Sequence, residues 1–323
     1  MSDALQDARH SEMLKAVFQL NAAEFSRCFA PPTLCARPAI RAHSVQNATC
    51  LDLLADNGHV IGLSRRMSAA APPEISFARI GRHRATTFAG LCADHDRRIF
   101  APIETAAFDT ANPEHLFLAA YRATFREVHA SCAAGWMLQM GYQKRVELGL
   151  DAGNVPSDAG LLATRQLIMA HQTFVYKLAF DEAYLARDFV AIQHDTFEIG
   201  TPRPLLAACC LFSIDDAVTA DDVVRVCLNV LPLSARRTVI ILSYTRGDAA
   251  AARGSLDRIL SATGPHRLYE LSKRLLNSCE NFVVAPAHLD TWPEAKRDTI
   301  RAYFLRTLLK DALDYEHEAL YLF

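Results

Sequence analysis

Apolar residues recur at helical spacing along two long stretches of this chain. They run from about 113 to 149 and from about 157 to 190, and each predicts one long helix. Asn112 is a suitable cap for the first helix, because Pro113 then occupies the first helical position, where no hydrogen bond is lost. The short segment between the two stretches predicts that the helices pack antiparallel as a hairpin. Shorter helices are expected at 3–24, 45–56 (capped by Ser44), 248–263, 266–279 and 292–313.

Runs rich in β-branched and aromatic residues predict strands on either side of this hairpin. Two short candidates precede it and four follow it, at 59–63, 74–81, 189–199, 204–214, 237–245 and 280–286. Helices and strands that do not alternate regularly are typical of α+β proteins. We therefore predict an α+β fold whose C-terminal part is a mixed β-sheet with flanking helices.

Composition narrows the class of protein. Apolar residues make up 51% of the 323 residues, enough for a large core, and 34 basic residues nearly balance 36 acidic ones. This balance argues against a whole-protein electrostatic surface for nucleic acid, although a local basic patch remains possible. The longest apolar run, 204–214, is too short to span a membrane, and the N-terminus has no apolar signal segment, so we expect a cytoplasmic protein.

Two clusters of potential metal ligands lie in the first hundred residues. Cys28 and Cys35 stand on a proline-rich loop, and Cys92 and His95 form a C-x-x-H pair at a predicted helix start. Nine cysteines, an odd number, favour free thiols and a metal site over a disulfide framework in a cytoplasmic chain. His43 is an alternative ligand in place of His95 or one cysteine. The alternative to a metal site is that Cys28 and Cys35 are ordinary small apolar residues.

The order of these features is that of a treble-clef zinc module. A loop carries two ligands, strand candidates follow, and the first turn of a helix carries two more. The helix dipole and a bound metal both favour a thiolate at that position, and zinc takes four N or S ligands. We predict structural Zn²⁺ and three units: a zinc-binding treble-clef-like module at 1–110, a helical hairpin at 111–190 and an α+β domain at 191–323.

Several motifs resemble those of a family of uncharacterised bacterial proteins. They are the cysteine pair, AHSV, NGHV and FAGLCADHDRRIFAPIE, followed by FLAAYRATFRE and, near the C-terminus, CENFVVAP. The likeness covers about 100 residues, and the family has no established activity that it could imply for this chain.

The module is also similar, more distantly, to HNH endonucleases. That resemblance implies a water-activating histidine at the position of His43 and a Mg²⁺ ligand at Asp96, beside His95. Imidazole suits a general base near neutral pH, and a carboxylate suits a hard cation such as Mg²⁺. The insertion between the ligand clusters is long for the nuclease unit, and the sequence leaves open whether the protein is an enzyme.

Two functions follow as hypotheses. The first is a zinc-braced binding protein that contacts nucleic acid or a protein partner, and the second is an HNH-like Mg²⁺-dependent endonuclease, in a setting such as bacterial defence. Motifs for nucleoside triphosphates, dinucleotides, zinc proteases and α/β-hydrolases are absent from the sequence.

Five arginines could contact phosphates or form a solvated rim offset by nearby aspartates: Arg79, Arg82, Arg84, Arg97 and Arg98.

Overall fold

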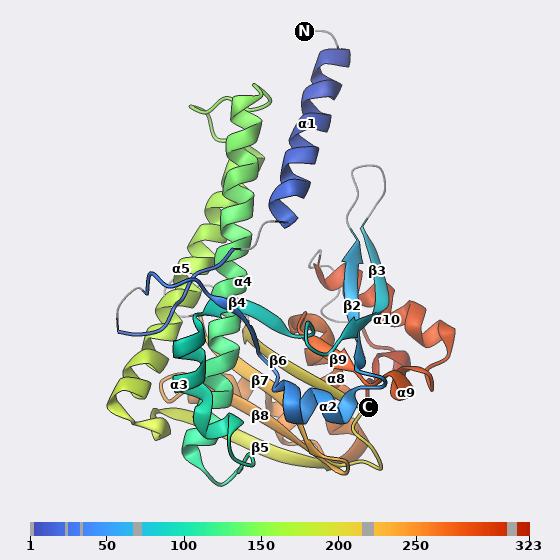
Figure 1. Cartoon of the computed structure of the whole chain (residues 1–323). Coiled ribbons are helices and arrows are strands. Elements are labelled where there is room, and N and C mark those ends of the chain that lie inside the picture. The colour runs from blue at the N-terminus through green and yellow to red at the C-terminus, as the bar shows by residue number, and fades with distance from the viewer. Residues whose placement is uncertain (1–2, 23–24, 33–34, 67–72, 215–222, 309–314) are drawn as a thin grey trace.

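A seven-stranded sheet forms the centre of the computed structural model, which describes residues 3–22, 25–32, 35–66, 73–214, 223–308 and 315–323 (Figure 1). The strand order is β3-β2-β9-β6-β7-β8-β5, and every neighbouring pair is antiparallel. The strands are β2 (His59–Arg66), β3 (Glu74–Gly81), β5 (Ile192–Gly200), β6 (Leu206–Ser213), β7 (Arg225–Ser234), β8 (Arg237–Thr245) and β9 (Phe282–Val284). The predicted α+β class is confirmed, but the prediction of a mixed, purely C-terminal sheet is wrong.

The two faces of this sheet belong to two separate apolar cores. In β6, Ala207, Cys209 and Leu211 contribute to one core, while the alternate residues from Leu206 to Phe212 contribute to the other. Successive side chains of a strand point to opposite faces, so central strands covered on both faces are apolar throughout.

The long helical hairpin covers one face. It consists of α4 (Pro113–Glu147) and α5 (Asp158–Ala186), and α4 packs on β6 and β7. The side chain of Asn112 accepts a hydrogen bond from the backbone N–H of Glu114 at 2.9 Å, which confirms the predicted cap. The upper half of the hairpin rises beyond the sheet, with α1 (Asp3–Ala22) beside α4 (Figure 1).

Short helices cover the opposite face. They are α6 (Ala249–Ser255), α7 (Asp257–Leu260), α8 (Gly264–Ser278), α9 (Pro286–Leu289) and α10 (Glu294–Leu308), with a 3₁₀ turn at Glu318–Leu320. A second 3₁₀ turn, Phe189–Ala191, packs against the hairpin instead. On α8, Leu271, Leu275 and Leu276 are buried, as the spacing of an amphipathic helix requires. Within the described residues, none of the helices is both long and apolar enough to cross a membrane.

A second, two-stranded sheet positions the residues of interest. Strand β1 (Ile40–His43) pairs antiparallel with β4 (Thr87–Leu91), which leads directly into α3 (Ala93–Glu104). A π-helical turn (Asn47–Leu51), α2 (Asp52–Leu54) and the β2–β3 hairpin lie between them. Ser44 does not cap the helical segment; its hydroxyl donates to the carbonyl of Thr86 at 2.8 Å.

The first 110 residues therefore supply strands to both sheets. Strand β2 pairs with β9, so the β2–β3 hairpin extends the main sheet. The division into units at 110 and 190 stays a prediction.

Candidate metal centre

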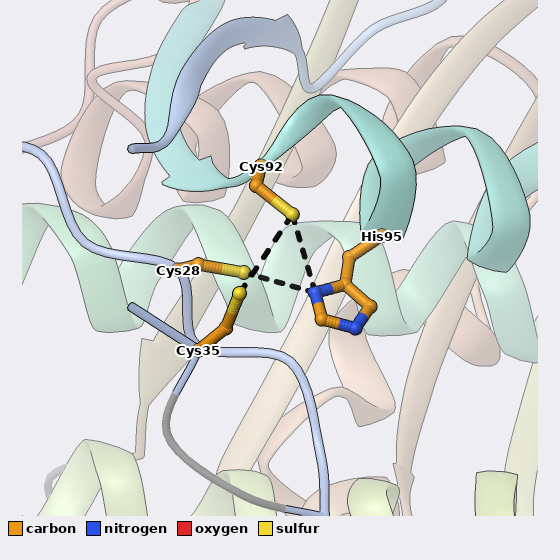
Figure 2. Close-up of side chains that lie close together, drawn as sticks. All are labelled: Cys28, Cys35, Cys92 and His95. Atoms are coloured by element: carbon orange, nitrogen blue, oxygen red, sulfur yellow. Dashed lines mark hydrogen bonds between the residues drawn. The ribbon is translucent and has the colours of Figure 1, made fainter. Parts of the chain in front are cut away.

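Four side chains from two distant segments converge on one point. The ligand atoms of Cys28, Cys35, Cys92 and His95 all lie within 4.8 Å of one another (Figure 2). The Nδ1 atom of His95 is 3.3 Å from the sulfur of Cys28 and 3.3 Å from that of Cys92, and the sulfurs of Cys35 and Cys92 are 4.0 Å apart. This Cys₃His group consists of the four residues that the sequence analysis proposed as ligands, and it could hold a metal ion.

Backbone pairing brings the loop to the helix. Cys28 and Cys35 face each other in an isolated antiparallel bridge, so the loop turns back on itself between them. The N–H of Arg27 donates to the carbonyl of Ala89 at 3.3 Å, and the N–H of Phe29 donates to that of Gly90 at 3.0 Å. Because β4 ends beside these carbonyls, the loop sulfurs lie next to the start of α3.

The first turn of α3 supplies the other two ligands. Cys92 occupies the N-cap position with extended backbone, and its carbonyl accepts from the N–H of Asp96 at 2.9 Å. His95 follows one turn later on the same side, as C-x-x-H spacing at a helix start requires. Arg37 of the ligand loop forms an ion pair with Asp94, a second link between loop and helix.

The thiols differ in acidity. Burial raises the pKa of Cys28 to about 11. Burial also acts to raise the pKa of Cys92, but hydrogen bonds from the backbone N–H of His95 and from the thiols of Cys28 and Cys35 lower it below its ordinary value. Burial, with the positive charges of Arg98 and Arg37, lowers the pKa of His95. A neutral imidazole binds metal ions, and a thiol with a lowered pKa forms the metal-binding thiolate more readily.

His43 lies outside this group. It ends β1, and its Nε2 atom is 3.0 Å from the carbonyl oxygen of Arg82, so Nε2 carries the proton and Nδ1 the lone pair. Burial lowers the pKa of His43, and the positive charge of Arg122 acts in the same direction. His43 is not among the four side chains of the Cys₃His group.

A buried arginine connects His43 with the helix of the metal centre. Arg122 of α4 is 3% exposed, lies 3.9 Å above the ring of Phe100 and donates to the carboxylate of Glu104 at 2.6 Å. Its charge also acts on Asp96, which stands two turns before Glu104 on α3. Among the described residues, the Nε of Arg122 and one carboxylate oxygen of Asp96 are buried without a hydrogen-bond partner. We call Asp96, Glu104 and Arg122 the arginine centre.

Ser44, next to His43, is tied to the main sheet. Its hydroxyl accepts from the side-chain amide of Asn281 at 2.7 Å, and that amide also donates to the carbonyl of Cys209 at 2.8 Å. The strand end that carries His43 is thereby fixed to β6 and to the residue preceding β9.

No protein-family model, curated protein or solved structure matches the chain. The resemblances to the bacterial family and to HNH endonucleases therefore stay predictions. Among the residues that the structure describes, the Cys₃His group is also the one place where three or more Cys, His, Asp or Glu side chains lie close enough to share an ion.

Sequence reasoning missed Arg122 and Glu104. A signal was present in the sequence, because Arg122 interrupts the largely apolar stretch 116–125, and a charge buried there requires a partner. The pairing of Arg122 with Glu104, 18 residues earlier, is not visible in the spacing.

The five arginines differ in their partners. Arg79 pairs with Asp56 at 3.5 Å and Arg82 with Asp52 at 3.0 Å, which fits a solvated rim for these two. The other three are exposed and form no ion pair with the rest of the described chain: Arg84 before β4, and Arg97 and Arg98 on α3.

Proposed function

We propose that the Cys₃His group binds one structural Zn²⁺. Bonds of about 2.3 Å to sulfur and about 2.0 Å to nitrogen give tetrahedral edges of about 3.8 Å between sulfurs and about 3.6 Å between sulfur and nitrogen. The corresponding separations here are 4.0, 3.3 and 3.3 Å, so small side-chain adjustments bring the four atoms around one ion. Four protein ligands leave no open position, which is typical of structural zinc.

The zinc would brace a treble-clef-like unit. The bridged loop of Cys28 and Cys35, the β1–β4 pair and α3 follow in the order of that unit, with the 59–81 hairpin as an insertion. The ion would join the ligand loop to the start of α3, in addition to the backbone bonds to β4 and the Arg37–Asp94 ion pair.

We further propose that this unit binds nucleic acid. The observation that carries the proposal is the exposure of Arg97 and Arg98, unpaired within the described residues, on the helix whose first turn the zinc fixes. The planar guanidinium of arginine loses less conformational entropy per hydrogen bond to phosphate than a lysine does, and Arg84, in the turn before β4, adds a third such charge.

Fluorescence anisotropy with labelled single- and double-stranded DNA and RNA at increasing salt tests this proposal. The triple variant Arg84→Gln/Arg97→Gln/Arg98→Gln should weaken binding to all sequences and reduce the salt slope by about 3 for duplex DNA, because each contact contributes about 0.9. Arg236→Gln, at an exposed arginine in the β7–β8 turn, is the matched control and should bind as wild type. Absence of binding at low salt, or an unchanged slope in the triple variant, would contradict nucleic-acid binding and leave a protein partner as the alternative.

The endonuclease is the second candidate, and the placement of His43 favours it. His43 lies outside the Cys₃His group, with the lone pair on Nδ1, and shares the charged neighbours Arg122 and Glu104 with Asp96. His43 would accept a proton from water at Nδ1, and Asp96 would bind Mg²⁺ together with water and phosphate oxygens. The carbonyl of Arg82 would hold the imidazole in the required tautomer.

Mg²⁺-dependent nicking of supercoiled plasmid separates this candidate from simple binding. His43→Ala should lower the rate at least about 100-fold, the usual contribution of a general base, while zinc content and nucleic-acid affinity stay at wild-type values. His83→Ala is the control, since His83 is an exposed histidine in the same turn as Arg82. Equal nicking by wild type and His43→Ala, or none by either, would eliminate the catalytic role.

A further inference from the structure

Helix α5 exposes a stripe of apolar side chains. Eight of the thirteen exposed large apolar side chains of the described residues belong to this one helix. Soluble monomers rarely expose contiguous apolar surface of this length, because its burial is favourable. The eight are Leu161, Leu162, Leu167, Ile168, Met169, Val175, Leu178 and Leu185.

The centre of the stripe follows a heptad repeat. Leu161, Ile168 and Val175 are spaced by seven residues. Leu178 lies three residues after Val175, and Leu185 lies seven residues after Leu178. Their exposed fractions lie between 40 and 59%. Thr164, His171 and Glu182 occupy the alternate seam positions. Each heptad still places at least one apolar side chain on the seam, which favours packing against a second helix.

We propose that α5 pairs with α5 of a second copy of this chain in an antiparallel two-helix contact. When two copies are aligned about residue 173, Leu161 lies opposite Leu185 of the second copy, and Ile168 opposite Leu178. Val175 then meets His171 of the second copy, so the two outer pairs join apolar side chains and the central pair joins an apolar side chain to a polar one. A twofold axis repeats each of these contacts, which makes the surface self-complementary.

The charges on the stripe favour the same alignment. Arg165 and Glu182 are exposed and form no ion pair within the described chain. In the antiparallel register, Arg165 comes within one residue, about 1.5 Å along the axis, of Glu182 of the second copy. A parallel alignment would instead place like charges together, so charge complementarity selects the antiparallel pair.

The helix is long enough for a stable contact. Its 29 residues extend over about 44 Å, and the α4–α5 hairpin carries it beyond the sheet (Figure 1). The middle of the seam, at Ile168 and Val175, borders a groove of about 590 Å³ between α5 and the sheet end at Arg225.

Sedimentation equilibrium of the zinc-loaded full chain tests the pairing. Wild type should have twice the mass of one chain at micromolar concentration, and Ile168→Glu/Val175→Glu should be a monomer over the same range. Val190→Glu is the matched control, because Val190 is 58% exposed but lies outside the stripe. Circular dichroism and zinc content of the variants should stay at wild-type values, since the substituted side chains are on the surface.

Charge reversal tests the register. Arg165→Glu and Glu182→Arg should each weaken dimerisation about tenfold, because two attractive pairs become repulsive, and the double variant should recover wild-type affinity. A monomeric wild type, or a dimer insensitive to Ile168→Glu/Val175→Glu, would overturn the proposal. Failure of the double charge reversal to recover affinity would overturn the antiparallel alignment.

Discussion

Serine in place of Cys92 is expected to release the bound metal and to lower the free energy of unfolding by about 4 kcal/mol. That is the contribution of a ligand present at about a thousand times its dissociation constant. Cys92 is 2% exposed and joins β4 to the first turn of α3, so its sulfur contacts both halves of the Cys₃His group. A hydroxyl at this position is neither a thiolate nor a good zinc ligand.

Metal analysis and chemical denaturation check this prediction together. Wild type should carry one equivalent of zinc per chain, and Cys92→Ser less than about a tenth of that. Cys132→Ser is the control, because Cys132 is a half-buried free cysteine on α4 outside the group, and it should retain both metal and stability. Wild type purified without metal from zinc-supplemented medium would contradict the zinc assignment.

Local sequence patterns predicted the helices and strands in which apolar residues recur at a regular spacing. The long helices α4 and α5 follow from apolar spacing, and the cap predicted at Asn112 is present. The structure also shows a cap at Ser157 that was not predicted. Strand β7 escaped prediction, because Asn229 and Pro232 interrupt its apolar run. The proline lies beside a register shift between β7 and β8, and such irregular positions are where strands tolerate proline.

The pairing of strands could not be predicted from local sequence. Strands β1 and β4 are short, and the whole β2–β3 hairpin lies between them in the sequence. Strand β2 pairs with β9, more than 200 residues away, so neither the sheet order nor its antiparallel character is encoded in any single segment. The predicted mixed sheet was wrong for this reason.

The candidate site shows the same division between local and non-local information. The C-x-x-H pair of Cys92 and His95 is a local signal, because the spacing itself places both side chains on one side of a helical turn. The arginine centre and the bond between Ser44 and Asn281 depend on packing between segments 18 and 237 residues apart. No spacing rule connects such residues, although an arginine within an apolar helix indicates that a partner must exist.

A buried ion pair beneath the ligand loop provides the second large expected effect. Lys177 of α5 is 1% exposed and donates to both carboxylate oxygens of Asp181, at 2.7 and 2.5 Å. The hydroxyl of Tyr121 on α4 donates to the same carboxylate at 2.5 Å. Burial lowers the pKa of Lys177, and the charge of Asp181 opposes that shift. The ammonium lies 5.4 Å from the centre of the Phe174 ring, which packs edge-on against Phe29, next to ligand Cys28.

Methionine in place of Lys177 is expected to lower the free energy of unfolding by about 3–5 kcal/mol. Methionine fills nearly the same volume, so the loss would come from the carboxylate of Asp181, which would be left buried without its cation. The double variant Lys177→Met/Asp181→Asn should recover most of this loss, because it removes the buried charge and keeps an acceptor for the hydroxyl of Tyr121.

Urea denaturation of wild type, both single variants and the double variant measures the coupling. Zinc content should stay at one equivalent in all four proteins, since none of the substitutions touches a ligand, and this separates the ion pair from the metal. Arg65→Met, which removes an exposed ion pair with Glu280, should cost less than about 1 kcal/mol. A double variant as unstable as Lys177→Met would show that the loss arises from packing and not from the unpaired charge.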